Sequence, residues 1–231
     1  MNSGEVQAGA WQSDQVMSSE GTAPPGIAPP PDAVPVVPPT LVHRPTSYVE
    51  RLDVARLFGR SQPLEVELGS GDGSFLAQYA ARHPERNFIG VERLLGRLRK
   101  LDRKGLRAGL TNLRLLRIEA SYCVEFLLPA QSVSALHVYF PDPWPKRRHH
   151  RRRLINVRFA ETVAQALAPG GVIYLRTDDA DYYAEMTRVF GSNPCFRPAG
   201  TPLPLAEMLT DFERGFLNRG ISTLSAAYQR Q

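Results

Sequence analysis

Cysteine is scarce in this chain, and the two that are present, Cys123 and Cys195, show no paired spacing. A disulfide framework and a structural zinc site both need more cysteines or a cysteine–histidine cluster, so neither is expected. Long apolar runs are also missing: no segment is apolar over the roughly 20 residues that cross a bilayer, and no secretory signal core is present. We therefore expect a cytoplasmic protein without metal or membrane contact.

Apolar periodicity is nearly absent from the N-terminal part, where eight prolines crowd residues 24–39. Such composition cannot bury enough apolar surface to fold, so residues 1–45 are predicted to be a disordered tail. The remaining residues, 46–231, suit one α/β domain of ordinary size.

The net charge of +5 is unevenly distributed. Its largest concentration is a basic run of eight residues, whose cations outweigh the net charge of the whole chain: Lys146, Arg147, Arg148, Arg151, Arg152 and Arg153. A one-sign patch on a nearly neutral body indicates a local contact with a polyanion. His149 and His150 within the run are too weak a signal to propose as ligands or bases.

Short apolar runs alternate with helical periodicity from Leu64 onward, which is typical of a parallel sheet covered on both faces. We predict a Rossmann-like, doubly wound, mostly parallel α/β fold, with residues 224–228 as an antiparallel edge strand and a helix ending at Pro169-Gly170-Gly171. Glu65 does not fit, because it should lie on the same side of a buried strand as Glu67. The predicted parallel strands are residues 64–68, 87–92, 113–118, 133–140 and 172–176.

Three glycines, Gly69, Gly71 and Gly73, follow the first predicted strand of the sheet. A dinucleotide fingerprint would have its third glycine at position 74, where this chain has Ser74, so the spacing favours S-adenosylmethionine. Glu92, at the end of the next strand, is placed to accept hydrogen bonds from two ribose hydroxyls.

Two further acids follow the same logic. Glu67, just before the loop, can receive the ammonium of the methionine moiety, and Glu119, after the third strand, can lie near the adenine. The alternative is that the glycines form only a tight turn and the acids are solvated loop ends.

A proline-rich loop, Phe140-Pro141-Asp142-Pro143-Trp144-Pro145-Lys146, follows the fourth predicted strand. Its prolines stiffen a loop beside the expected methyl donor, where an acceptor base has to enter. Asp142 is the candidate working residue, able to orient a base and to stabilise positive charge developing on it. Trp144 either stacks on a base or packs within the protein, and packing is the commoner role.

The basic run that follows the loop has two interpretations. One is phosphate binding, which releases counterions and makes affinity depend on salt. The other is a solvated helix start, although cations at a helix N-terminus oppose the macrodipole.

Together these motifs make the chain resemble the bacterial tRNA (guanine-N7-)-methyltransferase family over about residues 57–230. The resemblance implies a class I enzyme that transfers a methyl group from S-adenosylmethionine to N7 of a guanosine, at position 46 of the variable loop, with tRNA as partner and no obligate protein partner. The motifs are Phe58-Gly59-Arg60, Glu67-Leu68-Gly69-Ser70-Gly71, Gly90-Val91-Glu92, the loop of residues 140–146, Thr177-Asp178 and Thr210-Asp211-Phe212-Glu213.

The resemblance also assigns roles. It implies Asp142 as the catalytic position and assigns the methyl donor to Glu67, Gly69, Gly71, Glu92, Glu119 and Asp142. It assigns the substrate to Lys146, Asp178, Thr210, Asp211, Phe212 and Glu213, and the RNA backbone to Arg147, Arg148, Arg151, Arg152 and Arg153. From the residues alone, Thr210 to Glu213 is equally a capping box that opens a helix.

Two positions depart from the family pattern. Glu119 replaces the usual aspartate or asparagine, and Asp179 stands where an aromatic residue often follows the Thr-Asp pair. Two other functions remain open. The first is a methyltransferase of another RNA base or of a small molecule, but this would not explain the clustered cations. The second is a catalytically silent RNA-binding scaffold, but this would not explain why the acids and glycines of a donor site are intact.

Overall fold

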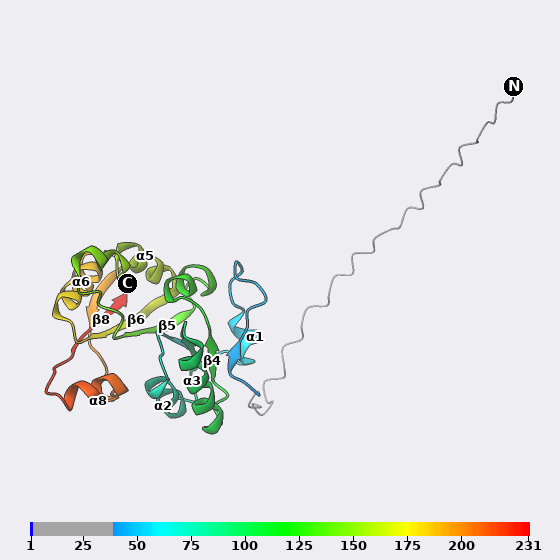
Figure 1. Ribbon diagram of the computed structural model, residues 1–231, viewed down its shortest axis with the longest axis horizontal. Coiled ribbons are helices and arrows are strands. Elements are labelled where there is room, and N and C mark those ends of the chain that lie inside the picture. The colour runs from blue at the N-terminus through cyan, green and yellow to red at the C-terminus, as the bar shows by residue number, and fades with distance from the viewer. Residues whose placement is uncertain (2–38) are drawn as a thin grey trace.

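The computed structural model describes residue 1 and residues 39–231. Residues 39–231 form one eight-stranded sheet with helices on both sides (Figure 1). The strand order is β1-β4-β3-β2-β5-β6-β8-β7; the pairs from β1 to β6 are parallel, and β8 is antiparallel to both its neighbours. The strands are β1 (Val42–His43), β2 (Leu64–Leu68), β3 (Asn87–Val91), β4 (Leu113–Leu116), β5 (Val133–Tyr139), β6 (Leu167–Thr177), β7 (Phe196–Ala199) and β8 (Leu224–Arg230).

The helices of the described residues fill the connections between these strands. They are α1 (Val54–Phe58), α2 (Ser74–Arg82), α3 (Leu95–Arg107), α4 (Ala120–Tyr122), the π-helix η1 (Cys123–Leu127), the 3₁₀ helix η2 (Arg147–Arg152), α5 (Val157–Ala166), α6 (Ala180–Gly191), α7 (Leu203–Ala206) and α8 (Asp211–Leu217). Not one of them is both long and apolar enough to span a membrane.

The predicted fold class is confirmed, with three differences in detail. The C-terminal strand β8 is antiparallel as predicted, but it is not the edge, because β7 pairs on its outer side. The short β7, which contains Pro198, gave no clear strand pattern. Helix α5 ends at Ala166, and β6 runs on through Pro169-Gly170-Gly171, where a helix end was predicted.

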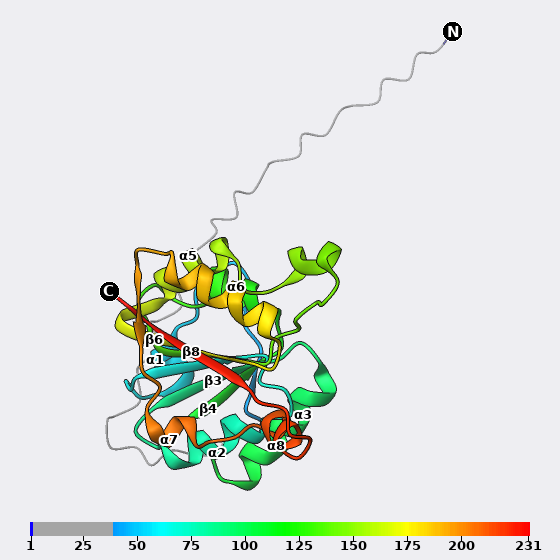
Figure 2. The ribbon, with the colours of Figure 1, turned by 90° about the vertical axis from the view of Figure 1, so that its left-hand side faces the viewer.

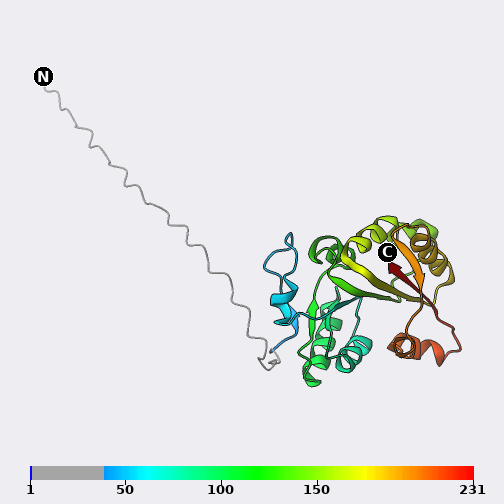
Figure 3. The same cartoon turned by 180° about the vertical axis from the view of Figure 1, so that it is seen from behind.

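The last residues of the predicted tail, 39–45, lie among the described residues and contact the domain. Residues 2–38 of the predicted tail lie outside the described residues, but Leu41 is fully buried and Val42–His43 pairs with β4. Asp102 of α3 accepts hydrogen bonds from the Leu41 backbone (2.7 Å) and the Thr40 hydroxyl (3.1 Å), which attach this segment to the domain. Figure 3 shows the blue N-terminal part of the described chain beside the rest of the domain.

The sheet separates two apolar cores. On one face, β2, β5 and β6 pack Val66, Val138 and Ile173 against α5, α6 and η1. On the other, α2 and α3 pack Leu76, Leu98 and their neighbours against β3 and β4. Figure 2 shows α5 and α6 above the sheet and α2, α3, α7 and α8 below it.

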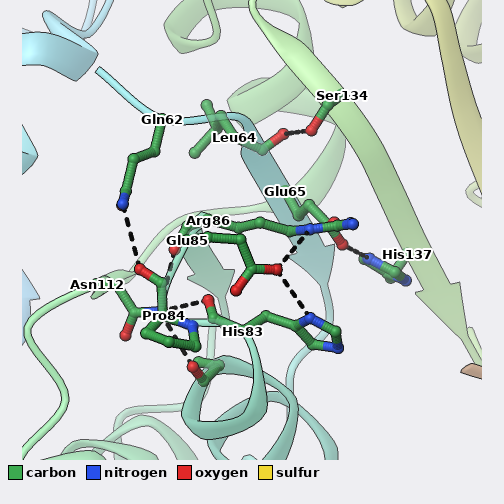
Figure 4. Close-up of polar contacts among 11 residues, drawn as sticks. Gln62, Leu64, Glu65, His83, Pro84, Glu85, Arg86, Asn112, Ser134 and His137 are labelled. Atoms are coloured by element: carbon green, nitrogen blue, oxygen red, sulfur yellow. Dashed lines mark hydrogen bonds and ion pairs between the residues drawn. The ribbon is translucent and has the colours of Figure 1, made fainter. Parts of the chain in front are cut away.

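The structure explains the buried Glu65 that the sequence left without a role. Its side chain is 1% exposed, and its carboxylate accepts hydrogen bonds from the Arg86 guanidinium and from Nε2 of His137, the latter at 2.8 Å (Figure 4). Nδ1 of His137 lies 2.8 Å from the Tyr139 hydroxyl. Burial alone would raise the pKa of Glu65, but His137 and Arg86 hold it below its ordinary value. Glu65, His137 and Tyr139 on this face of β2 and β5 therefore satisfy one another, together with Arg86.

Candidate active site at the carboxyl edge of the sheet

The glycine loop connects β2 to α2 at the point where neighbouring connections leave in opposite directions, since β3 lies on one side of β2 and β5 on the other. Ligands of doubly wound sheets bind at this switch point. Gly69, Gly71 and Gly73 have φ angles of 77°, 56° and 75°, a left-handed conformation that only glycine adopts readily. The amides of residues 69 and 70 donate to Val91 O at 2.9 and 3.0 Å, which holds the loop against β3.

Glu92 is 6% exposed at the end of β3 and faces this loop. Its carboxylate accepts the Gly71 amide at 3.1 Å and the Leu94 amide at 2.7 Å. A carboxylate offers about four lone-pair positions, so two remain for hydroxyl donors. The structure thus holds Glu92 against the glycine loop, and its role as a ribose acceptor stays a prediction.

The Glu67 side chain lies beneath the glycine loop, near the end of β2, and its carboxyl group is buried. The residue is 4% exposed, and its Oε2 atom is buried without a hydrogen-bond partner among the described residues. Burial raises the pKa of Glu67 to about 8, opposed by Arg176 and reinforced by Glu92 and Asp72. A buried carboxylate oxygen without a donor is costly, so this position suits a cationic or hydrogen-bonding ligand.

Glu119 has a task inside the protein. It is the N-cap of α4, and its Oε2 accepts the Tyr122 amide at 2.8 Å and the Ser121 hydroxyl at 2.6 Å. Burial would raise its pKa, but these hydrogen bonds lower it below the ordinary value. One of its two oxygens is therefore occupied in capping a helix, and the other has no partner among the described contacts.

The proline-rich loop leaves β5 with strained backbone, because Phe140 and Trp144 have φ angles of 53° and 47°. Asp142 lies on this loop with an exposed side chain. Arg153 donates through Nε to the Pro143 carbonyl at 2.7 Å, which anchors the loop next to Asp142. Trp144 is partly buried against the following run, with the Arg152 guanidinium 4.9 Å from its ring centre, so it packs within the protein.

Arg153 corrects the interpretation of the basic run. Its side chain is 2% exposed and binds Glu185 at 2.5 Å and Asp181 at 2.6 Å on α6. Because its guanidinium is enclosed by these acids and the Tyr182 ring, it is not part of an exposed phosphate-binding patch. The cations before it form η2, a helix of their own, and remain exposed: Arg147, Arg148, Arg151 and Arg152.

The segment Thr210 to Glu213 forms a capping box at the start of α8, as the residues alone indicated. Thr210 Oγ1 accepts the Glu213 amide at 3.1 Å, and Glu213 Oε2 accepts the Thr210 amide at 2.8 Å. Glu213 also forms a buried ion pair with Arg176 of β6, at 2.9 Å. Asp211 pairs with Arg214, whereas Phe212 is 56% exposed.

The remaining candidates lie at the same edge of the sheet. Asp178 and Lys146 are exposed after β6 and β5, respectively. Asp179 is the N-cap of α6, where it accepts the Tyr182 amide at 2.7 Å, so it shapes the backbone after Asp178.

Sequence reasoning missed Arg176. The residue is 4% exposed; it donates to the Leu205 and Met208 carbonyls at 2.6 and 2.8 Å and lies over the Tyr139 ring. A cation inside a predicted parallel strand was the available signal, because buried charge needs a partner. In the part of the chain that the structure describes, no group of three or more potential metal ligands gathers.

Comparison with known proteins identifies the family. The model of the family described as "Putative methyltransferase" matches residues 61–223. A tRNA (guanine-N(7)-)-methyltransferase of Halorhodospira halophila is 38% identical over 182 residues, which cover 73% of this chain and 75% of that protein. The corresponding protein of Alkalilimnicola ehrlichii is 36% identical, with 78% of each chain covered.

Solved structures support the fold. The 16S rRNA methyltransferase KamB aligns with a TM-score of 0.55 at 18% identity and covers 79% of this chain and 95% of its own. TrmN from Thermus thermophilus aligns with a TM-score of 0.53 at 18% identity, covering 77% of this chain and 47% of its own. Sequence and fold together show that the chain belongs to the tRNA (guanine-N7-)-methyltransferase family.

Proposed function

We propose that this protein transfers the methyl group of S-adenosylmethionine to N7 of a guanosine in tRNA, at position 46 of the variable loop. The observation that carries the proposal is the buried, unpartnered Glu67 Oε2 beneath the glycine loop, next to a loop that presents Asp142 and exposed cations. Family membership supplies the acceptor.

The residues around the glycine loop fit the methyl donor. Glu67 offers its free oxygen to the donor ammonium, and the two remaining acceptor positions of Glu92 suit the ribose hydroxyls. The left-handed backbone of Gly69 and Gly71 leaves no side chain between the loop and the ligand. Glu119 can contribute only its Oε1, since Oε2 caps α4.

On the acceptor side, the chemistry asks for positioning rather than for a strong base. When bound, S-adenosylmethionine supplies an electrophilic methyl group, and guanine N7 already carries the lone pair that receives it. Asp142 would accept hydrogen bonds from the base edge and stabilise the positive charge that develops on the ring. The Arg153 bond to Pro143 would keep Asp142 in place.

The other substrate contacts are proposed at the same edge. Lys146 and Asp178 are exposed there, and Phe212 offers an aromatic surface on which a base can stack. Thr210 and Glu213 would act through the capping box, by fixing the start of α8, with Asp211 beside them. The backbone cations of the proposal are those that are exposed on η2: Arg147, Arg148, Arg151 and Arg152.

The decisive experiment incubates the protein with unmodified tRNA and methyl-labelled donor and then maps the labelled nucleotide. We expect one label at N7 of guanosine 46, and none when a tRNA carrying adenosine at that position is used. The variant Asp142→Asn should lose most turnover and still bind the donor. Label at another nucleotide would refute the position, and no label on any tRNA would refute the activity.

A further inference from the structure

The outer surface of α3 is a second basic surface. Sequence analysis overlooked it because acids elsewhere in the chain balance these cations in the net charge. We propose that this surface binds the tRNA backbone, as a contact separate from η2; the inference rests on the proposed tRNA substrate. The exposed cations of α3 are Arg97, Arg99, Lys100, Arg103 and Arg107.

These five side chains have no acidic partner among the described residues. The ion pair formed by α3 is that of Lys104 with Asp72, at 3.0 Å. The helix contains one acid, Asp102, and both its oxygens accept hydrogen bonds from the segment before β1. The cations are therefore left facing solvent, which is the condition for binding phosphates.

The arrangement is unfavourable for the helix itself. Arg99 and Arg103 lie four residues apart, as do Arg103 and Arg107, and like charges at this spacing repel across one turn. Arg97 lies in the first turn, where the macrodipole disfavours a cation. The macrodipole explains the cations of the last turn only, so the rest indicate an anionic partner.

The position of α3 suits a substrate that extends across the carboxyl edge of the sheet, where the candidate site lies. Helix α3 begins three residues after Glu92, and η2 follows the loop after β5. Since β2 alone separates β3 from β5, the two connections leave the edge about 10 Å apart. They then diverge: α3 lies on the face of α2, whereas Arg153 attaches the end of η2 to α6 on the other face (Figure 2). A base that enters beside Asp142 would thus have basic surfaces on both sides.

The test compares two charge reversals in the full-length protein. Lys100→Glu/Arg103→Glu changes α3, and Arg82→Glu/Arg197→Glu makes the same change in net charge at exposed positions near the opposite edge of the sheet. Binding of unmodified tRNA is measured by fluorescence anisotropy over a range of salt concentrations. For the α3 variant we expect affinity about ten-fold lower and a log–log salt slope smaller by about 2, because two phosphate contacts are lost.

Thermal unfolding of both variants controls for folding, and the α3 variant should unfold no earlier, because repulsion within its helix is relieved. Equal affinities and salt slopes for the two variants, in a protein whose wild type methylates tRNA, would overturn the α3 contact. A wild type that methylates no tRNA would instead refute the proposed function. Loss of binding to phosphatidylserine vesicles with tRNA binding intact would assign the surface to membranes and overturn the proposal.

Discussion

The two faces of strands β2, β5 and β6 are built from different chemistry. Toward α5 and α6 they carry apolar side chains such as Val66, Val138 and Leu175. Toward α2 and α8 the alternate positions carry buried polar groups: Glu65, Glu67, His137, Tyr139 and Arg176. One face is an ordinary core, and the other is a connected polar layer that ends at the glycine loop and at α8.

The polar face departs from the usual composition of buried parallel sheets. Both faces of such sheets normally read as apolar runs. Here the polar layer satisfies nearly all its groups internally, through Arg86, Glu65, His137 and Tyr139 at one end and Arg176 with Glu213 at the other. Among its carboxylates, Glu67 keeps a free oxygen, and it lies at the candidate donor site.

The largest loss of stability is expected when the Arg176–Glu213 ion pair of the polar face is removed. Arg176→Met removes the partner of Glu213 at a site where both side chains are about 5% exposed or less, so the free energy of unfolding should fall by about 3–5 kcal/mol. Methylation of tRNA should fall as well, because α8 is attached to β6 through this pair. Urea unfolding and a turnover assay measure the two effects.

The double variant Arg176→Met/Glu213→Gln serves as its control. Glutamine preserves a capping-box acceptor and leaves no buried charge, so part of the lost stability should return. A double variant as unstable as the single one would show that the charge pair is not the cause.

The neighbouring Leu175, on the apolar face, gives the matched comparison. Leu175→Ala should lower the free energy of unfolding by about 2–5 kcal/mol through cavity formation. Turnover per folded molecule should stay near that of wild type at temperatures below the transition, because Leu175 packs away from the candidate site. A large loss of turnover at full folding would remove the functional distinction between the faces.

A smaller effect is expected at Glu92, beside the end of the polar layer. Glu92→Ala is expected to weaken S-adenosylmethionine binding by about 1–3 kcal/mol, because a charged acceptor is lost from two hydroxyls. Isothermal titration calorimetry measures this, with Glu119→Gln as a variant whose effect should be smaller, since Glu119 already serves as a helix cap. If Glu92→Ala left the affinity for S-adenosylmethionine unchanged, Glu92 would only stabilise the loop through its hydrogen bonds.

The smallest effect, taken per unit of pH, is a pH dependence at Glu67, whose pKa is raised by burial from 4.5 to about 8. Between these values the unfolded chain is ionised and the folded carboxyl is protonated, so this group makes stability fall as pH rises toward 8, by about 1.4 kcal/mol per unit at most. An ammonium ligand selects the carboxylate, so donor affinity should rise with pH up to about 8, with proton release below it.

Calorimetry in buffers of different ionisation enthalpy detects that proton. Glu67→Gln should abolish the release, whereas Glu119→Gln should retain it, because the pKa of Glu119 lies below its ordinary value. Donor binding at pH 7 without proton release would show that the ligand does not meet a protonated Glu67.

Sequence reasoning predicted the parts of this molecule that local pattern determines. The strand after Pro63, the glycine loop and Glu92 follow from spacing and residue type, and the capping box at Thr210 was legible in four residues. The proline-rich loop and basic run were visible for the same reason.

What sequence reasoning missed depends on contacts between distant segments. Glu65 looked anomalous because its partners, Arg86 and His137, come from other elements. Arg153 looked like one more exposed cation until α6 placed two acids around it. The strand β1 is too short to show a pattern and is ordered by Asp102, about sixty residues away.

The packing of Gly73 joins parts of the molecule that were described separately. A Cβ at this position would lie 2.6 Å from Leu101 Cγ, in the middle of α3, so with any other residue either the turn or Leu101 would have to shift. The turn at the candidate donor site therefore packs directly against the helix that carries the second basic surface, and a shift of one would displace the other. Selection that preserves the turn at Gly73 should therefore limit sequence change in α3, and the reverse should hold as well. Substitutions made in this turn to alter donor specificity should also disturb RNA binding through α3.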